Sequence, residues 1–138
     1  MRILISGASG FVGSHLIPRL ARDGHDLRAF ARDATRVKAD VEVLEGDAVS
    51  GAGLAQAFEG VDVAYFLIHS MEPSPDETFV DRERRAAENF ARASRDAGTQ
   101  RVVYLGGLVP AAGEIPRLAR DGHDLRAFAR DATRVKAD

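Results

Sequence analysis

Residues 2–13 read RILISGASGFVG, a short apolar run followed by Gly7, Gly10 and Gly13. The run is typical of a buried strand, and the residues after it have the apolar spacing of a helix. In such a unit Gly7 permits a sharp turn, Gly10 lets a phosphate approach the backbone, and Gly13 lets the helix lie close to the strand. The stretch therefore predicts a dinucleotide-binding turn at the positive end of a helix. The competing interpretation is a glycine-rich turn that binds nothing.

Strand and helix patterns alternate along the rest of the chain. The first helix should turn Val12, Leu16 and Leu20 inward and end at Gly24, and the strand after it should be half-buried, with alternating faces. Strands are expected at 2–6, 26–32, 41–44, 61–68 and 101–105, and later helices near 54–58 and at 78–97. This order predicts an α/β fold, a Rossmann-like doubly wound parallel sheet with right-handed crossovers.

Length and composition limit the classes of protein that fit. The 138 residues, of which 45% are hydrophobic, predict a single domain over residues 1–138. A net charge of −2 provides no bulk positive field for nucleic acid or an anionic membrane. With no cysteine there is no disulfide framework or thiolate site, and we recognise no metal motif. The first residues lack a secretory profile, so we expect a cytoplasmic protein.

One segment of the chain occurs twice. Residues 17–40 and 115–138 both read IPRLARDGHDLRAFARDATRVKAD, and an identity without any difference favours a very recent or engineered duplication. We expect the second copy to add a sixth parallel strand at 124–130, beside the fifth. The alternative is exchange, in which the copy replaces the second strand of its own or a neighbouring molecule and gives a swapped homodimer.

Six stretches carry a resemblance to a known family: SGASGFVG, GHDLRAFARD, VLEGDA, GVDVAYFLIH, RAAENFARASRDAG and RVVYLGG. Over about residues 1–108 the chain resembles the nucleotide-binding half of the short-chain dehydrogenase/reductase superfamily. It is most similar to the extended and atypical branch, whose members are sugar-epimerase-like or nitrogen-metabolite-regulator-like. The resemblance implies a Rossmann sheet with the cofactor over the first helix and an adenine contact from Asp47, which follows Gly46. The alternative for Asp47 is a turn or helix-cap aspartate.

The second strand bears on the choice of cofactor. An NAD-binding protein needs an acid about 20 residues beyond the glycines, and Ala31 occupies that place. Arg32 follows it and can pair with a 2′-phosphate, so NADP(H) is favoured over NAD. Two alternatives stay open, since Asp33 can serve the ribose hydroxyls in a shifted register and Arg32 can be a solvated charge. Arg36 is a weaker candidate for the same phosphate.

The usual catalytic pair of the resembled superfamily is missing. Its reductases use a tyrosine with a lysine four residues later, and neither Tyr65 nor Tyr104 has that partner. His69 and Ser70 follow the fourth strand at the expected nicotinamide end, where they are weak catalytic candidates. The alternative is an exposed loop histidine and a turn serine, and otherwise the catalytic residues are unknown.

Three classes of function remain open. The first is an NADP-binding domain of an oxidoreductase- or epimerase-like protein with little or no turnover. The second is a non-catalytic dinucleotide-sensing regulator, and the third is an engineered folding or domain-swap scaffold. The predicted cofactor-binding residues are Gly7, Ser9, Gly10, Phe11, Val12, Gly13, Arg32, Asp33, Gly46 and Asp47.

Overall fold

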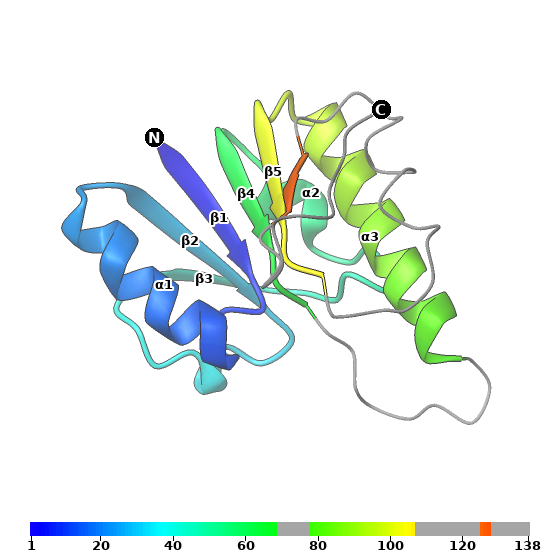
Figure 1. Ribbon diagram of the computed structural model, residues 1–138, viewed down its shortest axis with the longest axis horizontal. Coiled ribbons are helices and arrows are strands. Elements are labelled where there is room, and N and C mark those ends of the chain that lie inside the picture. Colours follow the sequence, from blue (N-terminus) through cyan, green and yellow to red (C-terminus); the bar gives the residue numbers. More distant parts are fainter. Residues whose placement is uncertain (69–77, 107–124, 128–138) are drawn as a thin grey trace.

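A parallel sheet forms the centre of the molecule. The computed structural model describes residues 1–68, 78–106 and 125–127. In these residues the strand order is β3-β2-β1-β4-β5-β6, and every neighbouring pair is parallel (Figure 1). The strands are β1 (Arg2–Ser6), β2 (Asp26–Ala31), β3 (Glu42–Glu45), β4 (Val63–Phe66), β5 (Arg101–Tyr104) and β6 (Leu125–Ala127). The order reverses direction between β1 and β4, which is where such sheets bind ligands.

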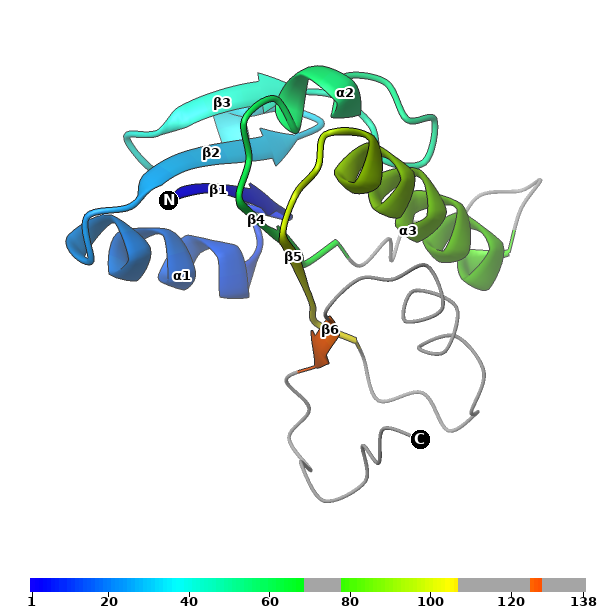
Figure 2. The same cartoon turned by 90° about the horizontal axis from the view of Figure 1, so that it is seen from above.

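Helices cover both faces of this sheet. Figure 2 shows α1 (Phe11–Arg22) on one face and α2 (Leu54–Ala57) and α3 (Phe79–Asp96) on the other. A 3₁₀ turn, η1 (Ala34–Arg36), follows β2. The doubly wound α/β fold expected from the sequence is therefore confirmed. No helix in the described part of the chain is both long enough and apolar enough to cross a membrane.

Two details of the sequence prediction are wrong. Val12 does not face inward, because its side chain is 42% exposed and α1 instead buries Gly13 and Ile17. β2 is not half-buried either, since its residues from Leu27 to Ala31 are all buried. The strand lies between β1 and β3, with apolar clusters against each of its faces. Its alternating pattern therefore does not mark a solvent face.

The duplicated copy contributes β6 to the described residues. β6 lies at the sheet edge and pairs with β5 so that Val102 is opposite Leu125 and Tyr104 is opposite Ala127. The expected strand at 124–130 extends past β6 in both directions, and those additional residues lie outside the described ones. The rest of the duplicated copy also lies outside the described residues.

A charged side chain connects three elements on the α2 side of the sheet. Arg28 of β2 is only 8% exposed, and its Nε donates to Oε2 of Glu42 on β3 at 2.7 Å. Its Nη1 donates to three carbonyl oxygens at the end of α2, those of Gln56 (3.3 Å), Ala57 (2.9 Å) and Glu59 (3.1 Å). The guanidinium therefore donates to backbone acceptors at the end of the short helix, where intrahelical donors run out.

Replacing this guanidinium should destabilise the fold. We expect Arg28→Met to lower the free energy of unfolding by about 2–4 kcal/mol, because it leaves buried carbonyls and Glu42 without their donor. Urea unfolding followed by circular dichroism measures the change. The control, Arg19→Met, removes an exposed arginine that pairs with Asp23 along α1 and should cost less than about 0.5 kcal/mol. Equal losses in the two variants would contradict the role of Arg28.

Candidate functional site

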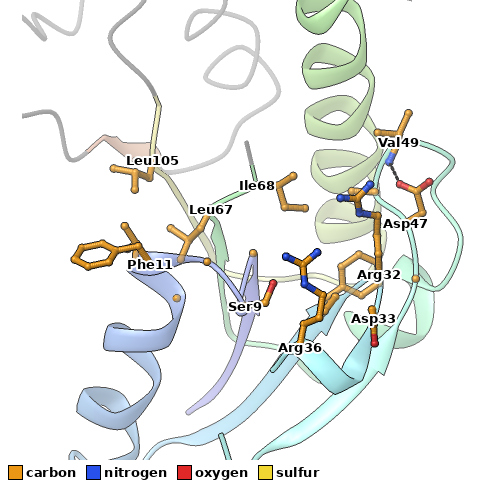
Figure 3. Close-up of a pocket in the computed structure, with 18 residues that line it drawn as sticks. Ser9, Phe11, Arg32, Asp33, Arg36, Asp47, Val49, Leu67, Ile68 and Leu105 are labelled. Carbon is orange, nitrogen blue, oxygen red and sulfur yellow. Dashed lines mark hydrogen bonds between the residues drawn. The ribbon is translucent and has the colours of Figure 1, made fainter. Parts of the chain in front are cut away.

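A cleft of about 540 Å³ opens at the carboxyl ends of the strands. Every residue that the sequence predicted to bind the cofactor lines it (Figure 3). The structure adds lining residues that the sequence analysis did not single out for the cofactor: Phe30, Ala31, Ala48, Val49, Leu67, Ile68 and Leu105. Phe30 and Ala31 end β2, and Leu67, Ile68 and Leu105 directly follow β4 or β5, so a place at the carboxyl end of a strand is the signal that could have found these five.

The glycine turn has the close backbone contacts that the spacing predicted. Gly7 has φ +73°, and a Cβ there would lie 2.7 Å from the carbonyl oxygen of Leu67. A Cβ on Gly13 would lie 2.5 Å from the carbonyl oxygen of Gly7 and 2.7 Å from Cα of Ala8. At Gly10 the nearest atom is the Gly7 carbonyl oxygen at 3.2 Å. The outer glycines thus bring strand, turn and helix together, while Gly10 leaves the cleft side open.

The amino end of α1 faces this opening. Its N-cap is Gly10, which offers no side-chain cap, and its first turn contains no acidic residue. The first intrahelical bond to the cap carbonyl comes from the N–H of Ser14. The N–H groups of Phe11, Val12 and Gly13 therefore have no acceptor within the helix, and together with the helix dipole they suit an anion.

Two arginines enter the cleft beside this turn. Figure 3 shows the guanidinium groups of Arg32, after β2, and Arg36, in η1, directed into the same part of the cleft. Asp33 lies between them in sequence, but its carboxylate is directed to the opposite side. Its Oδ1 accepts from the hydroxyl of Thr35 at 2.5 Å and from the N–H of Thr35 at 2.9 Å. These bonds, with a smaller contribution from the charge of Arg36, lower the pKa of Asp33.

Asp47 lies in the turn after β3. Its Oδ1 accepts from the N–H of Val49 at 2.8 Å, and its carbonyl oxygen accepts from the N–H of Gly51 at 2.8 Å. The N–H of Asp47 donates to the carbonyl oxygen of Ala52. The turn aspartate considered from the sequence is therefore present, and the same residue also lines the cleft. The adenine contact stays a prediction.

The two ends of the cleft differ in chemistry. Phe11, Leu67 and Leu105 lie together at one end, away from the charged groups around Arg32 and Asp47 (Figure 3). Phe11 is 81% exposed, which leaves a large apolar surface at the start of α1. One end thus suits a charged ligand group and the other suits a flat, partly apolar one.

The two catalytic candidates from the sequence, His69 and Ser70, lie outside the described residues. Tyr104 stacks on Phe66, with ring centroids 5.6 Å apart, and packs against the core. Within the described ranges no group of three or more histidine or acidic side chains could hold a metal ion.

The hydroxyl of Thr35 should control the charge of Asp33. Its bond stabilises the carboxylate, so the resulting stability is present above the ordinary pKa and is lost as the pH falls through the lowered one. We expect Thr35→Val to raise the pKa of Asp33 toward the ordinary value, as measured by NMR titration of the carboxyl carbon. Ser14→Ala, which removes a hydroxyl bonded to the Phe11 carbonyl oxygen, is the control and should leave that midpoint in place. An unchanged midpoint in Thr35→Val would contradict the assignment.

Comparison with known sequences identifies relatives of the chain. A family model described as NAD(P)H-binding matches residues 7–117. A 3 beta-hydroxysteroid dehydrogenase/Delta 5→4-isomerase of Mycobacterium tuberculosis is 32% identical over 113 residues, which cover 75% of this chain and 30% of that protein. A 3-diazoavenalumate denitrifying reductase of a Streptomyces species is 33% identical over 111 residues and covers 75% and 36%, respectively. The chain thus spans 30% to 36% of the length of these two relatives.

Solved structures show the same architecture. A nucleoside-diphosphate-sugar epimerase from Staphylococcus aureus superposes with a TM-score of 0.75 at 21% identity, over 92% of this chain and 49% of that one. A Bordetella bronchiseptica enzyme in complex with NAD superposes with a TM-score of 0.65 at 25% identity, over 76% of this chain and 37% of that one. These comparisons confirm the resemblance to NAD(P)-binding proteins of oxidoreductase- or epimerase-like kind.

Proposed function

The chain belongs to the NAD(P)H-binding family, and on that premise we propose that its cleft holds one molecule of NADP(H). The observation that carries the proposal is the uncapped amino end of α1 beside the two arginines of the cleft. The first-turn N–H groups offer donors to the pyrophosphate, and Gly10 lets it approach the backbone. The cleft fits the group because Gly7, Gly10 and Gly13 present no Cβ at the turn.

The preference for the phosphorylated cofactor rests on Arg32 and Arg36. A 2′-phosphate at the end of β2 would lie between two guanidinium groups, which bind phosphate oxygens in bidentate geometry. NAD would instead need an acidic side chain for its ribose hydroxyls. Asp33 is the nearest acid in sequence, but its Oδ1 already accepts from Thr35. Because Thr35 competes with the ribose hydroxyls for Asp33, NADP(H) is the first choice and NAD the second.

The other predicted cofactor-binding residues lie along the cleft and suit different parts of the cofactor. We assign Ser9 and the first turn of α1 to the pyrophosphate, and Gly46 and Asp47 to the adenine end. The apolar end beside Phe11 is left for the nicotinamide, which supplies hydride transfer when bound. No tyrosine of the sequence has a lysine four residues later, so we assign the chain cofactor binding with little turnover of its own.

Calorimetric titration with NADP⁺ and with NAD⁺ tests this function. Wild-type protein should bind NADP⁺ more tightly, and Arg32→Ala should weaken NADP⁺ binding by about 10- to 100-fold through loss of a charged hydrogen-bond pair. NAD⁺ binding should change less than about threefold in that variant. Arg22→Ala, which removes an exposed arginine bonded to the Pro18 carbonyl oxygen, is the control. Absence of binding to either nucleotide would exclude the function, and equal losses for both would exclude the role of Arg32.

We also propose that the whole chain is one domain, with the duplicated copy added to the β5 edge. The parallel register of β6 on β5 supports this arrangement over exchange with β2. Native mass spectrometry over a dilution series should then show a monomer at every concentration. A dimer that persists on dilution would instead support the homodimer by segment exchange.

A further inference from the structure

Asn89 of α3 bonds to a loop that lies far from it in sequence. Its Nδ2 donates to the carbonyl oxygens of Ala48 at 3.0 Å and Val49 at 2.8 Å. The side chain also packs on the same loop at Gly51, where an added Cβ would lie 3.6 Å from Cγ of Asn89. One amide thus holds the loop between β3 and α2.

A side-chain amide suits the chemistry of these bonds. Two carbonyl oxygens can only accept, so the group between them has to supply two N–H donors, which a side-chain NH₂ does. The other end of the amide, Oδ1, accepts from a guanidinium nitrogen of Arg92 one turn later on α3. The next residue, Phe90, is 2% exposed in the core under the sheet, so the helix gives the amide a rigid base.

The loop held in this way carries the aspartate of the cleft. Val49 accepts from Asn89 through its carbonyl oxygen and donates to Oδ1 of Asp47 through its N–H. Ala48, the other acceptor, lies between the two. The position of the Asp47 carboxylate therefore depends on the backbone to which Asn89 donates its hydrogen bonds.

We propose that Asn89 is a positioning residue for base recognition: it orients the carboxylate of Asp47 so that Asp47 selects a purine with an exocyclic amine. The proposal rests on the proposed function, since it needs a dinucleotide in the cleft. Oδ1 of Asp47 is taken by Val49, which leaves Oδ2 to accept from the amine of adenine. Hypoxanthine carries a carbonyl oxygen at that place and repels the carboxylate.

The test uses Asn89→Asp in the full chain. This change keeps the shape of the side chain but replaces the two N–H donors by an oxygen that faces two carbonyl oxygens. Gln100→Glu makes the same conversion of amide to carboxylate at an exposed residue beyond α3 and is the matched control. Asn89→Ala, which removes the amide without adding a charge, separates loss of the bonds from repulsion.

Amide hydrogen exchange measures the positioning without any ligand. The N–H groups of Val49 and Gly51 should exchange about tenfold faster in Asn89→Asp and Asn89→Ala, because their acceptors on Asp47 are no longer held in place. Protection of Leu4 in β1 should stay unchanged, as should all three sites in Gln100→Glu. Equal acceleration at Leu4 would mean that Asn89 serves the stability of the whole fold and would overturn the proposal.

Paired titrations with NADP⁺ and its hypoxanthine analogue measure the recognition. Wild-type protein should prefer the adenine form, and both Asn89 variants should reduce that preference about tenfold while Gln100→Glu retains it. The two ligands are titrated into separate portions of one protein preparation. A fraction of unfolded protein then affects both titrations alike and does not alter the ratio of the two dissociation constants. A ratio that stays at the wild-type value in the variants overturns the proposal.

The two arms separate this inference from the proposed function. If wild-type protein binds neither dinucleotide, the proposed function fails, and the exchange data still decide whether Asn89 holds the loop. If wild-type protein binds both forms equally well, the proposed function stands and the role of Asn89 in base recognition fails.

Discussion

The backbone contact between the glycine turn and α1 is the constraint on which the site depends. The carbonyl oxygen of Gly7 lies only 2.5 Å from where a Cβ on Gly13 would be, so no other residue type fits there without displacement of the backbone. This contact brings the amino end of α1 against the carboxyl end of β1 and leaves its first N–H groups facing the cleft. It also places Ile17 against the sheet, which secures the helix that carries those groups.

Around this turn the acidic side chains are held by local donors. Asp33 accepts from Thr35, and Asp47 accepts from Val49, in both cases two residues later in the sequence. Each bond satisfies the carboxylate within its own turn and sets the direction in which it points. Because the carboxylate of Asp33 turns away, Arg32 and Arg36 determine the charge that an incoming phosphate meets at the end of β2.

Long-range polar contacts hold the segment between β3 and β4, part of which lines the cleft. Arg28 joins β2 to β3 and to the end of α2, and Asn89 joins α3 to the loop that precedes α2. Both side chains donate to carbonyl oxygens of irregular or terminal backbone, which is the backbone that neither the sheet nor a helix satisfies. The segment from Gly46 to Glu59 is thereby held at its start by α3 and at its end by β2. Its rigidity is a property of the assembled fold.

The sequence by itself determined the order of strands and helices, the parallel sheet and the glycine turn, because periodicity and glycine spacing are local properties. It also indicated Arg32 and Arg36 for a 2′-phosphate and, through the family resemblance, Asp47 for the adenine, and all three line one cleft. Only the tertiary structure decided that Val12 is exposed and β2 fully buried, because burial depends on what packs against each face. Likewise, the acceptors to which Arg28 and Asn89 donate lie 14 to 41 residues away, and no local pattern encodes contacts of that range.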